Sequence, residues 1–362
     1  MFLLRNLQLF QFKNYPNRSF DFDGRIVSIC GSNGVGKTNI LDAIHYLCFT
    51  KSYFGGSDAA NVQHGRIGFR IEGNILLQDN AEKAVCILRE TGRKEFSIND
   101  EPYSRFSQHI GRYPCVIIAP DDAVLITGGS EGRRSFIDSL LSQIDSTYLK
   151  NLIQYNKVLQ QRNSFLKSAA ESGFLDEALL AVLNEQLATP GTQIFTKRRE
   201  FLLSFLPKVK RLYTEIAQRE EDLVLLYESR LSEAPMASLL EATRQKDALL
   251  QRTTVGIHRD ELTIQLNGQP FKSTASQGQR KSLLFALKLT ELEVIRQEKK
   301  FAPILLLDDI FEKLDENRMT NLLQKVCIEN EGQVFITDTH ATRVTEQLQN
   351  IGATFSLINL ED

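Results

Sequence analysis

Apolar and polar residues alternate through the first part of the chain, with Phe2, Leu4 and Leu7 among the apolar members. A period of two predicts β-strands, and the turn-forming residues 13–17 predict that two of these strands make a hairpin. Several short β-like runs follow between residues 67 and 118. The pattern therefore predicts an N-terminal lobe rich in antiparallel strands.

The period changes near residue 130, after which apolar residues recur three or four positions apart. Pro190 and Pro207 punctuate this pattern, and two antiparallel helices of this size would make an arm. We place the insert at 129–250, between two parts, 1–128 and 251–362, of one nucleotide-binding domain. The insert has three apolar stripes, which we interpret as core packing. The first is Leu152, Tyr155, Leu159 and Leu166, the second is Leu175, Ala178, Leu179, Val182, Leu183 and Leu187, and the third is Phe201, Leu202, Phe205 and Leu206.

A phosphate-loop motif, Gly-x4-Gly-Lys-Thr, occupies residues 31–38. An apolar run at 26–30 predicts a buried strand before it, and helical spacing follows it. Glycines let the backbone aim its N–H groups at phosphate oxygens, and the helix N-terminus adds positive potential. Lys37 would reach the β- and γ-phosphates, and Thr38 would offer its hydroxyl to Mg²⁺. The expected ATP contacts are Gly31, Ser32, Asn33, Gly34, Val35, Gly36, Lys37, Thr38 and Asn39.

A second nucleotide motif is the apolar run 304–307 followed by Asp308 and Asp309, the form of a Walker B strand. Asp308 would hold Mg²⁺ together with Thr38, and Asp309 would polarise the attacking water. Lys37, Asp308 and Asp309 are therefore the candidate catalytic residues. A further buried strand is predicted at 334–337, and the polar residues after it, Asp338 and His340 among them, are candidate γ-phosphate sensors whose roles the sequence leaves open.

The segment 273–280 opens a predicted helix and contains Ser276, Gln277, Gly278 and Gln279. A serine and a glycine at a helix start make a second anion site, and one chain cannot easily aim two such sites at one γ-phosphate. We therefore expect this signature to cap ATP held by another copy; a plain helix cap is the alternative. Leu314 and Asp315 would lie in a loop at the same interface.

Clusters of cations occur along the insert, and the sequence leaves open whether they lie on a solvated helix face or contact DNA phosphates. The net charge of the whole chain is −2, so any contact with nucleic acid must be a local basic patch. The candidate DNA contacts are Arg133, Arg134, Arg162, Lys197, Arg198 and Arg199.

The bulk composition favours a cytoplasmic protein. No apolar run of about 18 residues exists to span a membrane, and the N-terminus enters a strand pattern at once, without the form of a signal peptide. The 5 cysteines are scattered and show no metal-binding spacing, which is typical of a reducing compartment.

These motifs together resemble the SMC-like ABC ATPases, and within them the RecF family of bacterial replication and repair proteins. Four less generic stretches carry the closer resemblance: 10–15, 132–138, 159–163 and 256–262. The resemblance implies an α/β fold: an ABC-type P-loop ATPase head, with a mixed sheet and an antiparallel β subdomain, and an inserted helical arm. It also implies ATP and Mg²⁺ as ligands and an ATP-dependent homodimer with slow, DNA-stimulated hydrolysis.

For partners, the resemblance implies sequence-independent binding to double-stranded and gapped or single-stranded DNA, with RecR and RecO as mediators of RecA loading. An SMC-like structural ATPase, a transporter's ATPase subunit and a small-molecule P-loop kinase are the alternatives. The sequence does not give the preferred DNA structure, the hydrolysis rate or the surface that binds partner proteins.

Overall fold

The structure is a computed structural model in which residues 1–310 and 316–360 are described. Its internal packing divides the chain into two compact units. We call the first, Met1–Asp122 with Leu287–Asp362, the head, and the second, Ala123–Ala286, the arm. The arm extends past the limit expected at residue 250, because the strand that follows pairs with one inside the predicted insert.

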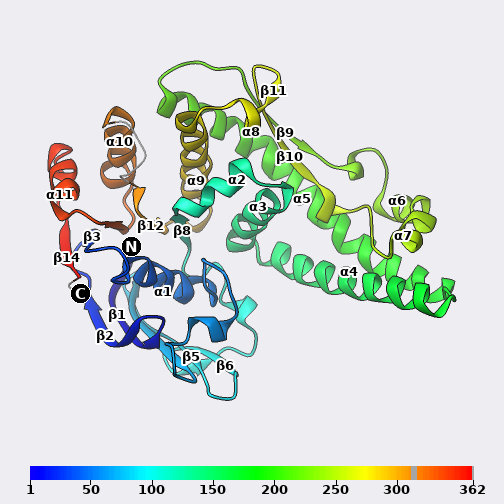
Figure 1. Cartoon of the computed structure of the whole chain (residues 1–362), viewed down its shortest axis with the longest axis horizontal. Helices are drawn as coiled ribbons and strands as arrows, with labels where there is room; N and C mark the ends of the chain where they lie inside the picture. The colour runs from blue at the N-terminus through cyan, green and yellow to red at the C-terminus, as the bar shows by residue number, and fades with distance from the viewer. Residues whose placement is uncertain (311–315, 361–362) are drawn as a thin grey trace. The chain divides into compact units, whose positions relative to one another are not determined.

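The head contains an antiparallel sheet and a parallel sheet (Figure 1). The hairpin and the strand-rich lobe predicted from the alternating pattern are confirmed in the first of them. Its strand order is β2 (Tyr15–Asp21), β1 (Phe2–Phe12), β4 (Phe69–Leu77), β5 (Asn80–Leu88), β6 (Lys94–Ile98) and β7 (Glu101–Pro102). The parallel sheet has the order β14 (Ser356–Asn359), β3 (Ile26–Cys30), β13 (Val334–Asp338), β12 (Ile304–Leu307) and β8 (Cys115–Ile118).

The parallel sheet gathers the ends of distant chain segments at one edge. Strands β3, β12 and β13 are buried along their whole length, as expected of a sheet covered on both faces. Asp338 is in register with Cys30, and Leu307 with Ile336. The segments after β3, β12 and β13 therefore leave the sheet side by side.

Helix α1 (Lys37–Phe49) packs on strands of both sheets in the head. Nearly every one of its residues is buried, which explains why it is apolar on more than one face. The head also contains the second half of α9 (Gln277–Lys299), together with α10 (Glu316–Leu323), the π-helical turn η7 (Gln324–Glu329) and α11 (Ala341–Asn350).

The arm is mainly helical and has one small sheet, β11 (Gln269–Pro270), β10 (Glu261–Leu266) and β9 (Leu223–Glu228). Two long helices, α4 (Ser146–Ser172) and α5 (Glu177–Ala217), run antiparallel in it, drawn in green in Figure 1. The remaining helices are α2 (Ala123–Thr127), α3 (Ser130–Ile144), α6 (Met236–Ala242), α7 (Arg244–Leu250) and α8 (Phe271–Thr274). No helix in the described ranges is long and apolar enough to cross a membrane.

Helix α5 continues through both prolines, so these residues do not end the helix. A side chain at Gly191 would lie 2.2 Å from the sulfur of Met236 and 3.0 Å from the ring of Tyr155, so this stretch packs closely inside the arm. The Thr192 hydroxyl donates to the Ala188 carbonyl at 2.8 Å, one turn earlier in the same helix. Tertiary packing thus outweighs the local cost of a proline.

Candidate nucleotide-binding site

The phosphate loop runs from the end of β3 to the start of α1, as the motif requires. Gly36 has φ 109°, and a side chain there would meet Asn14 and Tyr15 at 2.5–2.7 Å. Only glycine fits this position, because the backbone is left-handed and the space is filled.

The turn between β1 and β2 supports the phosphate loop directly. Asn14 Nδ2 donates to the Val35 carbonyl at 2.9 Å, and the Tyr15 hydroxyl donates to the Gly36 carbonyl at 3.2 Å. Asn39, a predicted nucleotide contact, donates through Nδ2 to Asn14 Oδ1 at 2.8 Å. The turn therefore braces the loop from outside.

Lys37 and Thr38 lie where the two nucleotide motifs meet. Lys37 Nζ donates to the carbonyls of Gly31 and Ser32 at 2.7 and 2.8 Å, so the ammonium group lies within the curve of the loop. The Thr38 hydroxyl is 3.0 Å from both carboxylate oxygens of Asp308. A hydroxyl next to a carboxylate is the kind of oxygen donor set that Mg²⁺ takes.

Asp308 is only 5% exposed and has a second hydroxyl partner. Thr337 Oγ1 donates to Asp308 Oδ1 at 2.7 Å and accepts from the Asp309 N–H at 3.0 Å. Burial raises the pKa of Asp308, and the hydrogen bonds from Thr337 and Thr38 oppose the rise. From the sequence, Thr337 is only the last residue of a predicted buried strand; its role depends on β13 lying next to β12, which no local pattern reveals.

Asp338 faces Arg343 and the start of α11. Both of its carboxylate oxygens accept from Arg343 Nη2, at 2.8 and 2.7 Å, and Oδ1 also accepts from the His340 N–H at 2.7 Å. These bonds occupy the carboxylate that the sequence offered as a γ-phosphate sensor, whereas His340 is exposed.

The signature segment lies in the arm and begins α9. Ser276 Oγ accepts from the Gln279 N–H at 3.2 Å, and Gln279 Oε1 accepts from the Ser276 N–H at 2.7 Å. This reciprocal pair is a capping box, so the segment does cap its helix. Ser276 and Gln277 are nevertheless exposed, while Gly278 is half-buried, so the helix start presents surface to a ligand. Leu314 and Asp315 lie outside the described residues.

Two of the predicted DNA contacts are interior residues of the arm, and we withdraw them. Arg162 is 0% exposed and pairs with Asp247 at 2.8 Å. Arg198 is 1% exposed and pairs with Asp138 at 2.7 Å and Asp260 at 3.0 Å. A guanidinium enclosed in this way cannot reach a phosphate.

The other four predicted contacts differ in accessibility. Arg133 pairs with Glu261 at 2.9 Å, and Arg134 donates to the Asp260 carbonyl at 2.7 Å, so both are largely committed within the arm. Lys197 is exposed and pairs with Asp145 at 3.0 Å. Arg199 is exposed, with its guanidinium 5.3 Å from the centre of the Phe195 ring.

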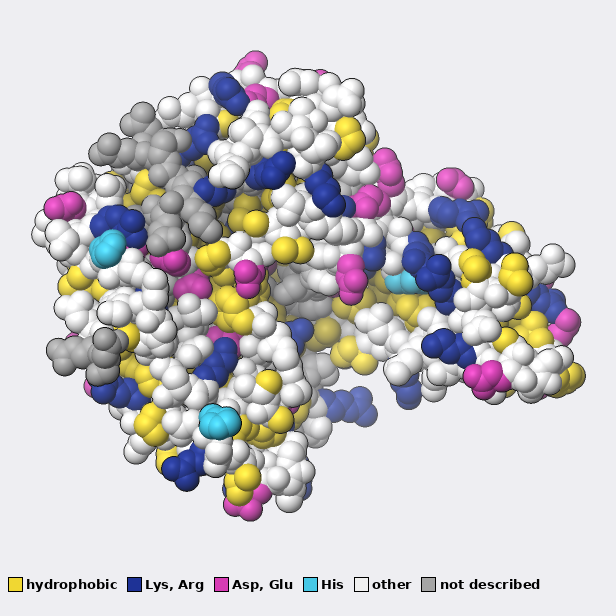
Figure 2. Space-filling model, viewed as in Figure 1, with side chains coloured by type: hydrophobic (Ala, Val, Ile, Leu, Met, Phe, Trp, Pro, Cys, Tyr) yellow, Lys and Arg dark blue, Asp and Glu magenta, His cyan; other side chains and the backbone are white. Residues whose placement is uncertain are grey.

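Exposed cations that the sequence analysis did not single out also lie on the arm. Figure 2 shows Lys and Arg side chains gathered on the face of the arm turned toward the viewer. The exposed cations of α4 and of the segment before β10 include Lys150, Lys157, Lys167, Arg252 and Arg259. The limit expected at residue 250 placed Arg252 and Arg259 outside the insert that contains the three lysines, whereas the arm includes all five.

A buried ion cluster lies in the head, where α9 meets the segments after α1 and β8. Lys288 Nζ is 3.8 Å from Asp122, 3.9 Å from Glu291 and 3.4 Å from the Tyr53 hydroxyl. Burial opposes the charge on Lys288, but these neighbours raise its pKa overall. Burial also raises the pKa of Glu291 to about 7, although Lys288 limits the rise. The groups around Glu291 are Lys288, Asp122, Tyr53 and the Cys115 thiol.

Glu291→Gln should gain stability relative to the wild type as pH rises. Burial keeps the pKa of folded Glu291 at about 7, whereas an unfolded glutamate loses its proton near pH 4.5. The wild type therefore loses stability between those values, by about 3 kcal/mol, and the glutamine variant does not. Urea unfolding at pH 5 and pH 8 measures the difference. Glu298→Gln, at an exposed position of α9, should show no such change; equal pH slopes for wild type and Glu291→Gln would contradict the assignment.

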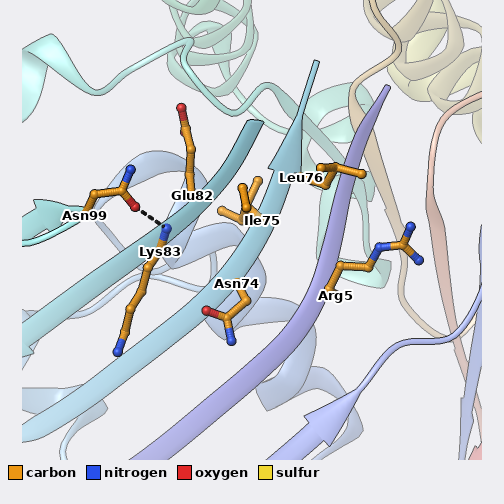
Figure 3. A pocket seen from close by; sticks show the side chains of 8 residues that line it. Arg5, Asn74, Ile75, Leu76, Glu82, Lys83 and Asn99 are labelled. Atoms are coloured by element: carbon orange, nitrogen blue, oxygen red, sulfur yellow. Dashed lines mark hydrogen bonds between the residues drawn. The ribbon is translucent and has the colours of Figure 1, made fainter. Parts of the chain in front are cut away.

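A separate hollow of about 330 Å³ lies over the antiparallel sheet (Figure 3). Its polar groups are largely occupied: Asn99 Oδ1 accepts from the Lys83 N–H at 2.8 Å, and Lys83 Nζ pairs with Glu72 at 2.6 Å. Its lining includes no residue of the phosphate loop or of the Walker B strand.

Comparison with known proteins places these features in one family. The family model described as RecF/RecN/SMC N terminal domain matches residues 3–358. The DNA replication and repair protein RecF of Flavobacterium johnsoniae is 44% identical over 357 residues, covering 99% of both chains. The protein of the same name from Bacteroides thetaiotaomicron is 37% identical, covering 99% of this chain and 97% of its own.

Solved structures agree with the sequence relatives. The recombination mediator protein RecF with ATP, from the RecFOR pathway, superposes with a TM-score of 0.87 at 30% identity, covering 94% of this chain and 93% of its own. An Smc head domain from Pyrococcus furiosus superposes with a TM-score of 0.56 at 15% identity, covering 100% of this chain and 94% of its own, and shows the shared fold. The expected head of the ABC ATPase type with long helical segments is confirmed.

Proposed function

The chain belongs to the RecF family, and we propose from this membership and from its nucleotide site that it is an ATP-dependent DNA-binding protein of replication and recombinational repair. The observation that carries the proposal is the contact between Thr38 of the phosphate loop and both oxygens of Asp308. It unites two motifs 270 residues apart in one oxygen-rich site next to Lys37. That site suits Mg²⁺ and the phosphates of ATP.

ATP would act as the ligand of a homodimer. Lys37 and Thr38 of one copy hold the phosphates, and the exposed start of α9, at Ser276 and Gly278, caps them in the other copy. Because only the dimer offers both halves of each site, ATP binding stabilises it by mass action. Asp309 then supports slow hydrolysis, which releases the copies.

DNA would contact the arm through its exposed cations, without reading the bases. The proposed DNA contacts are the predicted residues Lys197 and Arg199, together with the exposed residues Lys157, Lys167, Arg252 and Arg259. The substrates are double-stranded and gapped DNA in the cytoplasm, where RecR and RecO would serve as partners in loading RecA. Affinity should fall as salt rises, because each phosphate contact releases counterions.

Two complementary defective variants test the shared site. Lys37→Met removes the phosphate ligand, and Ser276→Arg blocks the cap, so each variant alone should neither hydrolyse ATP nor retain gapped duplex DNA. Their equimolar mixture forms heterodimers with one intact site and should recover about a quarter of the wild-type hydrolysis per chain if copies pair at random. Each variant must first give the wild-type far-UV circular dichroism spectrum.

The outcome separates the alternatives. No recovery in the mixture, although both variants are folded, would exclude a site shared between copies. Hydrolysis by Ser276→Arg alone would assign the whole site to one chain. Retention of DNA that does not weaken between 50 and 200 mM salt would exclude the phosphate-contacting arm.

A further inference from the structure

Thr337 connects the two acidic residues at the end of the Walker B strand. It lies on β13 and is fully buried. Its hydroxyl donates to Asp308 Oδ1 at 2.7 Å and accepts from the Asp309 N–H at 3.0 Å. One hydroxyl carries one proton and can still accept, so both bonds form at once.

The register of the parallel sheet explains why Thr337 has this role. Leu307 pairs with Ile336, so Asp308, the first residue after β12, lies beside Thr337, the next residue of β13. The other hydroxyl bonded to Asp308 is that of Thr38, which lies in the first turn of α1. Asp308 is thus held by two hydroxyls from two different elements.

Binding of Mg²⁺ would affect the hydrogen bonds of the two hydroxyls differently. Thr38 is the expected metal ligand, so its oxygen would have to turn from Asp308 toward the ion. Thr337 is buried behind the carboxylates and keeps its bond to Asp308 in either case. Partners of this kind orient metal-binding carboxylates and are worth about 10- to 100-fold in metal affinity or activity.

Asp309 depends on the same hydroxyl through its backbone. Its φ is 48°, in the left-handed region that residues other than glycine adopt at a cost. The bond from its N–H to Thr337 Oγ1 fixes that conformation, and with it the direction of the carboxylate proposed to polarise water.

From this geometry we infer that Thr337 is a positioning residue for Mg²⁺-dependent ATP binding and hydrolysis: its hydroxyl sets the orientation of the Asp308 side chain and of the Asp309 backbone. The inference rests on the proposed function, since it assigns a role within that site. It adds a third element, β13, to a site otherwise made by β12 and the phosphate loop.

Thr337→Val tests the inference because it keeps the shape of the side chain and removes only the hydroxyl. We expect the half-saturating Mg²⁺ concentration for ATP binding to rise by about 10-fold and kcat to fall by about 10- to 100-fold. Binding of a fluorescent ATP analogue in EDTA should stay within about twofold of wild type, because Lys37 and the loop are untouched. Thr337→Ser restores the hydroxyl and should recover most of both losses.

Thr342→Val, at an exposed position of α11, is the matched control and should behave as wild type. Equal losses for Thr337→Val in EDTA and in Mg²⁺, or no rescue by Thr337→Ser, would overturn the positioning role and leave a packing role only. If the wild type binds ATP in a Mg²⁺-dependent way but does not hydrolyse it, the proposed ATPase activity fails, while the Mg²⁺ titration still decides the role of Thr337.

Discussion

Arg198→Met should lower the free energy of unfolding by about 3–5 kcal/mol, more than any other single change in the arm that we predict. The guanidinium is buried between Asp138 and Asp260, and Asp260 is itself only 2% exposed. Methionine fills much of the space but leaves both carboxylates without the cation that balances them. Urea unfolding followed by circular dichroism measures the loss.

The cost comes from the whole network around Arg198. Its Nη1 also donates to the Ile257 carbonyl at 2.8 Å, and its Nε to the Tyr148 hydroxyl at 3.0 Å. The Tyr227 hydroxyl donates to Asp260 at 2.5 Å. Helices α3, α4 and α5 and the strand β9 therefore share one polar centre, and removing its cation affects each of them.

The pH dependence identifies the mechanism. Burial already raises the pKa of Asp260, and loss of Arg198 should raise it further. Asp260 in the variant then takes up a proton more readily, so the deficit should shrink as pH falls from 7 to 5. Arg199→Met changes the exposed neighbour and should cost less than about 0.5 kcal/mol. A deficit that is equal at both pH values would point to lost packing instead.

The sequence could predict the features that depend on neighbouring residues. The phosphate loop, its strand and its helix follow from a local motif and two local periods, and the run before Asp308 is apolar along its whole length. The turn at Asn99 and Asp100, both with positive φ, has residue types that favour such a turn on local grounds alone.

The sequence could not show which cations are buried, because burial depends on distant partners. Arg198 meets Asp138 and Asp260 across 60 and 62 residues, and Arg162 meets Asp247 across 85. In the sequence these arginines look like the exposed Lys197 and Arg199 beside them. For the same reason the sequence did not indicate the role of Thr337, whose two hydrogen bonds depend on the strand order in the sheet.

Lys37→Met should weaken ATP binding by about 100- to 1000-fold and abolish measurable hydrolysis. Lys37 Nζ lies among loop carbonyls, 2.7 Å from that of Gly31 and 2.8 Å from that of Ser32, at the point where the motif places the β- and γ-phosphates. Removing the cation from a hydrogen-bonded, largely buried charge pair costs about 3–4 kcal/mol, which corresponds to that loss of affinity. Titration with a fluorescent ATP analogue measures it directly.

The fold of the loop should survive the Lys37 substitution, which makes the result specific. Asn14 and Tyr15 brace the loop from outside through Val35 and Gly36, independently of the ammonium group. Lys51→Met, an exposed position just after α1, removes the same charge and should leave affinity within about twofold. If both variants lose affinity for the ATP analogue equally, the overall charge of the head governs ATP binding. If Lys37→Met alone binds as wild type, the phosphates lie elsewhere.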